Sequence, residues 1–311
     1  MPRHFPHLLD FTPAELLDML DTAARLKERR ARGVHDRLFE GRTLAMYFEK
    51  PSLRTRVSLE VAAASLGGHA INLEAPEPGA LWKRETIADQ ARVVSRMADI
   101  ISIRTFGHEV YEEFARHSRV PVINVLTDWA HPTQALADVL TLRERWGGEL
   151  AGRTLAYIGD GNNMARSLLE ACGRLGMRFV HTGPEPYGLP GEDYARAAAA
   201  CPGLEAKFDP DPARAVREAD CLYTDVWASM GRKEEAEARR KVFAPYQLDE
   251  TLLAKAPARA VVLHCLPAVR GEEITDGVMD HPERSLVFDQ SENRLHAYRG
   301  LIPWLLGDRN A

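Results

Sequence analysis

The chain is poor in cysteine, has no excess of positive charge and contains no long apolar run. Its four cysteines are Cys172, Cys201, Cys221 and Cys265, and none of them belongs to a C-x-x-C pair. A chain of 311 residues needs no disulfide framework, so we expect reduced thiols in a cytoplasmic protein. No segment is long and apolar enough to predict a membrane span, and the N-terminus lacks the apolar core of a signal peptide.

Several functional classes are disfavoured by missing features. Asp and Glu number 45 against 40 Lys and Arg, a formal charge of -5, and nucleic-acid-binding proteins are usually basic. The sequence has neither a G-x-x-x-x-G-K-[ST] phosphate loop nor a G-x-S-x-G nucleophile elbow. Gly159-Asp160-Gly161 resembles part of a dinucleotide-binding fingerprint, but Met164 stands where a third small residue is needed. We therefore expect no nucleic-acid partner, no cofactor and no resident metal.

What the sequence does contain is a regular alternation of short apolar runs with amphipathic stretches. Such alternation predicts βαβ units and parallel sheets. The predicted strands are 43–47, 70–73, 100–103 and 121–125, followed after Gly147-Gly148 by 154–158, 178–180, 221–223 and 260–263. The predicted helices begin after the capping box Thr12-Pro13-Ala14-Glu15 and include 52–66, 87–97, 108–118, 132–146, 163–175 and 292–306.

Two such series, at about 150 residues per domain, predict two parallel-sheet α/β domains joined by bridging helices. We expect a first domain of residues 1–145 with the C-terminal helix 291–311, and a second domain of residues 148–290. The helix at 132–146 is expected to connect them. The charged segment 232–241 is expected to be a solvated helix or loop.

Polar residues follow six of these strands, and ligands bind beyond the carboxyl ends of parallel strands. In the first series they are cationic or hydroxylic. Ser52, Arg54 and Thr55 come at a predicted helix start, where an anion is favoured, and Arg104 and His131 follow neighbouring strands. A single arginine at a helix start is a surface residue as often as it is a phosphate ligand. Polar residues at three neighbouring strand ends together predict a phosphate site.

The strand ends of the second series are neutral or anionic. Asp225, Ser229 and an asparagine at 162 or 163 suit a ligand with an ammonium and a carboxylate, which is an amino acid. Asp225 could equally be a turn residue, and a lone cysteine such as Cys265 is by default core packing. Because neighbouring residues of a strand face opposite ways, we expect His264 and Cys265 to be a poor metal-binding pair.

Several of these segments together resemble the aspartate and ornithine carbamoyltransferase family. Ser52-Leu53-Arg54-Thr55-Arg56 is similar to its carbamoyl-phosphate motif, and His131-Pro132-Thr133-Gln134 to its second motif. The segments 225–231 and His264-Cys265-Leu266-Pro267 look like the ornithine branch, and Glu292-Asn293-Arg294 also fits. The similarity runs from about Gly41 to the C-terminal helix.

The resemblance implies direct transfer of a carbamoyl group from carbamoyl phosphate to the neutral δ-amine of L-ornithine, giving L-citrulline and phosphate, in arginine biosynthesis. It implies a homo-oligomer built from trimers, and Arg104, His131 and Cys265 as catalytic residues. The implied carbamoyl-phosphate ligands are Ser52, Leu53 through its backbone, Arg54, Thr55, Arg104, His131, Gln134, Cys265, Leu266 through its backbone, and Arg294. The implied ornithine ligands are Asn163, Asp225, Ser229 and Met230.

One segment departs from the family pattern. Ala80 stands where the family has a Gln that reaches into a neighbouring subunit, and Trp82 stands where it has a Gly; Lys83 or Arg84 is the candidate replacement. Other acceptors within the family are putrescine, N-acetylornithine and aspartate, and the reaction could serve arginine breakdown. A non-catalytic amino-acid-binding protein is the alternative from another class, but it leaves Arg54, Arg104 and His131 unexplained.

Overall fold

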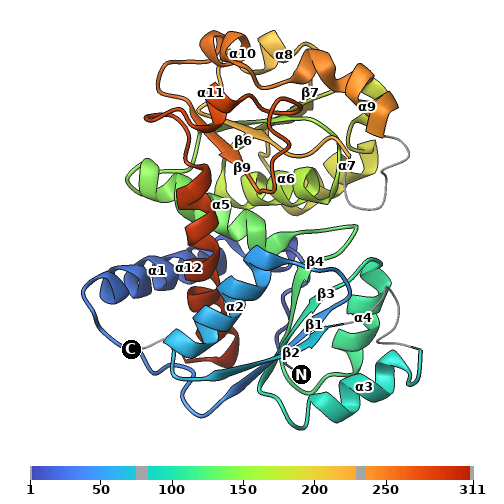
Figure 1. The fold of residues 1–311 in the computed structure, drawn as a ribbon, viewed down its shortest axis with the longest axis vertical. Coiled ribbons are helices and arrows are strands. Elements are labelled where there is room, and N and C mark those ends of the chain that lie inside the picture. The colour runs from blue at the N-terminus through green and yellow to red at the C-terminus, as the bar shows by residue number, and fades with distance from the viewer. Residues whose placement is uncertain (1, 75–82, 229–235, 309–311) are drawn as a thin grey trace. The chain divides into compact units, whose positions relative to one another are not determined.

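The computed structural model describes residues 2–74, 83–228 and 236–308. The chain divides into two compact units, one of residues 1–140 with 292–311 and the other of residues 141–291. Each unit is built on one parallel sheet covered by helices (Figure 1). The two parallel-sheet α/β domains predicted from the alternating pattern are therefore confirmed. In the described segments, no helix is sufficiently long and apolar to span a membrane.

The sheet of the first unit has the strand order β2-β1-β3-β4, and all its pairings are parallel. Its strands are β1 (Thr43–Phe48), β2 (His69–Glu74), β3 (Ile100–Arg104) and β4 (Val122–Leu126). Its connecting helices are α2 (Leu53–Ser65), α3 (Ile87–Val94) and α4 (His108–His117). All of these elements were predicted, and no boundary differs from its predicted position by more than three residues.

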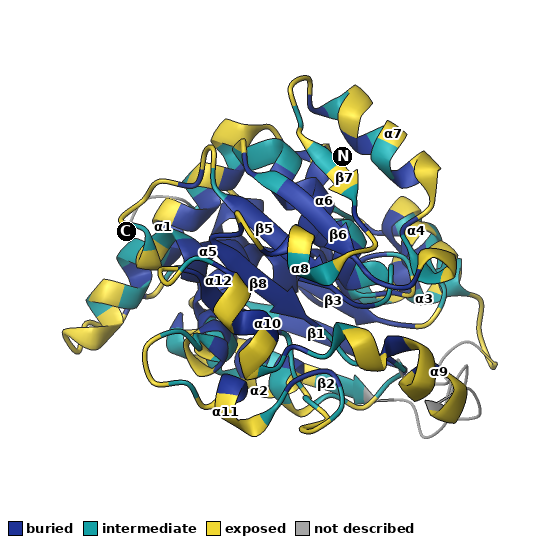
Figure 2. Cartoon of the chain, turned by 90° about the horizontal axis from the view of Figure 1, so that it is seen from above, coloured by how far each residue is buried: buried dark blue, intermediate teal, exposed yellow. Residues whose placement is uncertain are grey.

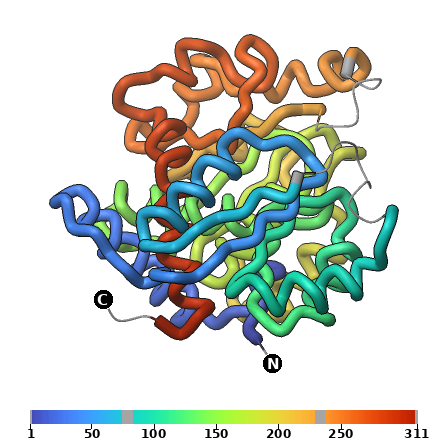
Figure 3. The backbone as a smooth tube through the Cα atoms, turned by 60° about the horizontal axis from the view of Figure 1, so that its bottom comes forward, coloured from blue at the N-terminus to red at the C-terminus, as the bar shows by residue number. Residues whose placement is uncertain are grey.

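Two further helices complete the first unit. α1 (Pro13–Ala31) starts at the predicted capping box, with reciprocal bonds between Thr12 and Glu15. α12 (Val287–Leu306) is the C-terminal helix, and its red tail runs beside blue α1 in Figures 1 and 3. Arg299 of α12 donates a hydrogen bond to the carbonyl oxygen of Leu26 at 2.8 Å. This packing fixes the helix that carries Arg294 in the first unit.

The approach of α12 to α1 depends on a glycine. A Cβ atom added at Gly300 would lie 2.6 Å from the carbonyl oxygen of Met19 and 2.8 Å from Cβ of Ala23. We expect Gly300→Ala to lower the free energy of unfolding by about 1–2 kcal/mol, because overpacking costs more than the helix propensity gained. Urea unfolding measures it. Gly191→Ala is the control, since a Cβ there meets nothing within 4 Å; equal stability of the two variants would contradict the prediction.

The second unit has a sheet of order β7-β6-β5-β8-β9, again parallel throughout. Its strands are β5 (Thr154–Ile158), β6 (Arg178–Thr182), β7 (Ala206–Phe208), β8 (Cys221–Thr224) and β9 (Val261–His264). β5 and β8 are wholly buried and appear dark blue in Figure 2. The edge strand β7 was not predicted; it has three residues and is only half-buried, so it leaves no apolar run in the sequence.

Helices α5 (Pro132–Arg145) and α6 (Asn163–Leu175) match their predicted ranges closely, and Gly176 ends α6 with a φ of 69°. The division between the two units falls within α5, after Leu140. The remaining helices of the second unit are α7 (Gly191–Ala200), α8 (Pro212–Ala215), α9 (Ala236–Phe243), α10 (Glu250–Lys255) and α11 (Asp276–Met279). The segment 232–241 was expected to be a solvated helix or loop, and its described part belongs to α9, in which residues 237, 238, 240 and 241 are exposed. Arg239 departs from this expectation, because it is only 3% exposed.

Candidate functional site

The first unit places its predicted phosphate-binding residues at adjacent strand ends. Phe48 of β1 is in register with Arg104 of β3, and Arg104 is in register with Leu126 of β4. The segments that leave these three strands therefore start side by side. Ser52 caps α2 by accepting a hydrogen bond from the backbone N–H of Thr55 at 3.4 Å. This helix start is the anion-favouring position that the sequence predicted.

Buried guanidinium groups gather at this edge of the sheet. Arg294 is 4% exposed and donates to Oε1 of Gln134 at 2.7 Å and to the hydroxyl of Thr55. Arg104 is 7% exposed. Burial, followed by the positive charges of Arg294 and Arg54, lowers the pKa of Arg104 to about 10. Arg104 remains charged at neutral pH, so several positive charges lie in this part of the first unit and repel one another. A bound anion would offset this repulsion.

The imidazole of His131 lies in the same positive environment. Its side chain is buried, and its pKa falls well below the usual value because of burial and then the charges of Arg294 and Arg104. His131 is therefore neutral at pH 7. A neutral imidazole can donate a hydrogen bond to a polarised carbonyl oxygen without adding a further positive charge. Leu53, by contrast, is 75% exposed, and its backbone lies at the start of α2.

The second unit brings three strand ends together in the same way. Ile158 of β5 is in register with Thr224 of β8, and Thr224 with His264 of β9. The residues that follow these strands are therefore neighbours. They include Asp225 and Cys265, which the sequence analysis selected. Ser229 and Met230, and likewise Ala80 and Trp82, lie outside the described residues.

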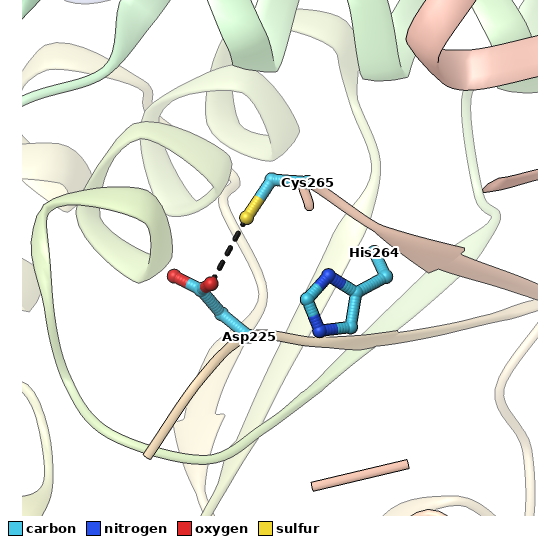
Figure 4. Close-up of side chains that lie close together, drawn as sticks. All are labelled: Asp225, His264 and Cys265. Carbon is cyan, nitrogen blue, oxygen red and sulfur yellow. Dashed lines mark hydrogen bonds between the residues drawn. The ribbon is translucent and has the colours of Figure 1, made fainter. Parts of the chain in front are cut away.

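Asp225 is the centre of this second cluster (Figure 4). Its Oδ1 accepts hydrogen bonds from the thiol of Cys265 at 3.0 Å and from the backbone N–H of Val226 at 2.8 Å. Its Oδ2 accepts from Nδ2 of Asn162 at 2.9 Å. Both carboxylate oxygens are thus fixed in direction, which is the preorganisation that a binding or catalytic carboxylate requires.

Asn162 is a residue to which the sequence analysis gave no separate role. Its Oδ1 accepts from the backbone N–H groups of Met164 and Ala165 and so caps α6. The hydroxyl of Tyr157 donates to the same oxygen at 3.1 Å. The cap turns the amide nitrogen toward Asp225, whereas Asn163 is the first residue of α6. The order of two adjacent asparagines in the sequence does not reveal this difference.

The expectation that His264 and Cys265 face away from each other is wrong. β9 ends at His264, so Cys265 is beyond the strand and strand alternation no longer applies. Donor atoms of Asp225, His264 and Cys265 all lie within 4.8 Å of one another (Figure 4). A metal ion nevertheless fits poorly, because Nδ1 of His264 accepts the N–H of Leu266 and Nε2 faces Glu273. An ion would have to displace one of these contacts.

Arg239 was not predicted to be a residue of this region. Its guanidinium donates to Oδ2 of Asp160 at 2.9 Å and to the carbonyl oxygen of Trp227 at 2.8 Å. It also lies over the ring of Tyr187, 4.8 Å from the ring centre. Arg239 thereby ties the segment after β5 to the segment after β8. Arg239 lies within the charged segment 232–241, so the sequence gives no sign of this role.

The two units match two family models. Residues 3–144 match the aspartate/ornithine carbamoyltransferase, carbamoyl-P binding domain, and residues 151–305 match the Asp/Orn binding domain of the same family. The chain belongs to the aspartate/ornithine carbamoyltransferase family. The family's domains bind carbamoyl phosphate and aspartate or ornithine.

Among its relatives, the anabolic ornithine carbamoyltransferase of Pyrococcus furiosus is 48% identical over 303 residues, covering 96% of this chain and 95% of the relative. The solved structure of ornithine carbamoyltransferase from Pyrococcus furiosus has a TM-score of 0.94 and 46% identity, covering 98% and 97% of the two chains. A structure of N-acetyl-L-ornithine transcarbamylase also matches, with a TM-score of 0.86, 31% identity and coverage of 97% and 99%. The fold alone therefore does not define the acceptor.

Proposed function

We propose that this chain is an ornithine carbamoyltransferase, which transfers the carbamoyl group of carbamoyl phosphate to the δ-amine of L-ornithine. The products are L-citrulline and phosphate. The observation that supports the choice of acceptor is the half-buried carboxylate of Asp225, which Asn162 and Cys265 hold by hydrogen bonds. A fixed carboxylate suits an acceptor with an ammonium group, and near-full-length relatives named ornithine carbamoyltransferase support the same acceptor.

The first unit is proposed to bind the donor. Arg54 with Ser52 and the start of α2 would neutralise the phosphate, with Gln134, Arg294 and the Leu53 backbone as further ligands. Attack of the amine on the carbamoyl carbon gives a tetrahedral oxyanion, which collapses as the bond from that carbon to the phosphate oxygen breaks, and the leaving phosphate takes up the proton that the nitrogen loses. Stabilisation of the oxyanion is usually the largest catalytic contribution. Arg104, neutral His131 and the Thr55 hydroxyl are proposed to stabilise it. The low pKa of His131 suits a donor that is not itself titrating at neutral pH.

The second unit is proposed to bind the acceptor through Asp225, Asn163, Ser229 and Met230. A lysine-like amine has a pKa near 10.4, so selecting its neutral form at pH 7 costs about 4–5 kcal/mol in water. The thiol of Cys265 donates a hydrogen bond to Asp225, and its sulfur is proposed to accept an N–H of the substrate amine. Cys265 would thus orient the nitrogen lone pair for attack, and the Leu266 backbone would contact the carbamoyl group.

An initial-rate assay of carbamoyl transfer to ornithine, putrescine, aspartate and N-acetylornithine in parallel tests the proposed function. We expect ornithine to have the highest kcat/KM, by at least a hundredfold over each of the others. A fixed carboxylate disfavours the carboxylates of aspartate, acetylation removes the α-ammonium of N-acetylornithine, and putrescine lacks the α-carboxylate of ornithine. Preference for another acceptor would overturn the assignment, and no turnover with any acceptor would favour the non-catalytic amino-acid-binding protein.

Three finer assignments belong to the same proposal. The direction is proposed to be arginine biosynthesis, in line with the relative named anabolic. The assembly is proposed to be a trimer or a multiple of trimers, which sedimentation equilibrium would measure. A cytoplasmic location is proposed because the four cysteines form no disulfide in the structure. Lys83 or Arg84 is proposed to replace the Gln that the family has at Ala80.

A further inference from the structure

A buried pair of titratable side chains stands outside the proposed chemistry. His264 and Glu273 have fully buried side chains, and Nε2 of His264 lies 3.0 Å from Oε1 of Glu273. The same carboxylate oxygen accepts the backbone N–H of Val269 at 2.6 Å. Glu273 therefore contacts both His264, at the end of β9, and Val269, in the segment that follows β9.

The contact with Glu273 fixes the tautomer of His264. A carboxylate oxygen can only accept, so the ring nitrogen facing it carries the proton. In a neutral imidazole the other nitrogen, Nδ1, then has a lone pair. That lone pair accepts the backbone N–H of Leu266 at 2.9 Å. The opposite tautomer would place two donors against each other at this point.

Leu266 needs such a restraint because of its backbone. Its φ is 58°, the left-handed region that residues other than glycine rarely adopt. Residues held in this region persist when their surroundings determine the conformation, and they cluster at functional sites. Leu266 directly follows Cys265, so its conformation also sets where the thiol points.

We propose that His264 and Glu273 are positioning residues, which act through the Nδ1 contact with Leu266 to hold the Cys265–Leu266 turn in the conformation used for carbamoyl transfer. This inference rests on the proposed function, which assigns both residues of the turn to the reacting groups. The thiol of Cys265 donates to Asp225 and Nδ1 of His264 is occupied, so the imidazole is not a proton acceptor for the thiol.

Two substitutions at His264 separate its two contacts. The side-chain oxygen of Asn lies as many bonds from Cβ as Nδ1, so His264→Asn keeps an acceptor for Leu266. His264→Gln keeps a group beside Glu273 and loses that acceptor. We expect kcat to fall about tenfold in His264→Asn and about a hundredfold or more in His264→Gln, with KM for ornithine changing less than threefold. His281→Gln is the control, because Nδ1 of His281 also accepts backbone N–H groups, of Glu283 and Arg284.

The double variant His264→Asn with Glu273→Gln tests whether Glu273 acts by fixing the tautomer of His264. Glu273→Gln alone is expected to lower kcat about tenfold, because an amide can also donate to Nε2 and allow the wrong tautomer. In the His264→Asn background no tautomer remains to be selected, so Glu273→Gln should cost less than twofold there. Additive losses, or losses in kcat that follow the fall in Tm across all variants, would overturn the positioning role.

Hydrogen exchange measured by mass spectrometry gives a readout that needs no turnover. The peptide containing Leu266 should exchange at least tenfold faster in His264→Gln than in the wild type, and near the wild-type rate in His264→Asn. Equal exchange in the two variants would refute the contact-based mechanism even if the wild type transfers carbamoyl groups. If the wild type shows no carbamoyl transfer but the variants show this exchange pattern, the proposed function and the catalytic use of the turn are refuted. His264 would then only restrain the backbone of Leu266.

Discussion

Replacing Arg104 by Met is expected to lower kcat/KM for carbamoyl phosphate about a thousandfold while leaving the fold intact. Removal of one preorganised donor to a developing oxyanion typically costs a hundredfold to a thousandfold, and Arg104 is also proposed to offset phosphate charge. Steady-state kinetics with saturating ornithine measures the loss. Arg116→Met is the matched control, because Arg116 is exposed and forms an ion pair with Glu113.

Although Arg104→Met is expected to lower kcat/KM, it should not lower the stability of the fold. The folded-state pKa of Arg104 is about 10, well below the ordinary value for arginine, so its charged form costs up to roughly 3 kcal/mol of folding free energy at every pH below about 10. The cost disappears only at a pH above the ordinary pKa of arginine, where the group is neutral in both the folded and the unfolded state. An apolar side chain of similar volume removes this cost, so we expect Tm to stay equal or rise.

Inorganic phosphate provides the second readout for Arg104. A ligand that binds only the folded state raises Tm by mass action. Phosphate should therefore raise Tm of the wild type and of Arg116→Met, and should raise it much less in Arg104→Met. A large fall in Tm without phosphate, or an undiminished phosphate response, would show that Arg104 is structural rather than an anion ligand.

The parts of the fold that the sequence predicted are those with strong local signals. The capping box at Thr12, the glycine that ends α6 and the buried strands β5 and β8 each follow from residues close together in the chain. The cationic set of the first unit was also predicted, since parallel strands bring their carboxyl ends to one edge. The edge strand β7 escaped prediction because it has three residues and lacks an apolar run.

The second-unit contacts could not be predicted because they depend on long-range geometry. Asp225 and Asn162 are 63 residues apart, and only the register of β5 with β8 brings them together. His264 and Cys265 were misjudged because the strand ends between them. Arg239 lies in a run of charges that was expected to be solvated, and Glu273 was not selected from the sequence, yet both are buried. In a run of charged residues, the sequence does not show which side chains are exposed to solvent and which are buried in hydrogen bonds and ion pairs.

Asp225→Asn is expected to lower kcat/KM for ornithine about a thousandfold while changing KM for carbamoyl phosphate less than threefold. The substitution removes the charge proposed to hold or orient an amine, and losing one member of a buried charge pair typically costs 2–5 kcal/mol. Steady-state kinetics with each substrate varied in turn measures it. Asp249→Asn is the control, since Asp249 caps α10 through the N–H of Leu252 and asparagine caps equally well.

An exchange of the two side chains separates the charge from the hydrogen bond. In the double variant Asn162→Asp with Asp225→Asn, the amide at 225 can donate to the carboxylate at 162, which still caps α6. We expect this exchange to restore Tm to that of the wild type and to leave kcat/KM for ornithine at least a hundredfold low. Because the pair then keeps its contact and its net charge, only the position of the carboxylate has changed. Recovery of ornithine turnover to within tenfold would show that a carboxylate beside Cys265 is not what the acceptor requires.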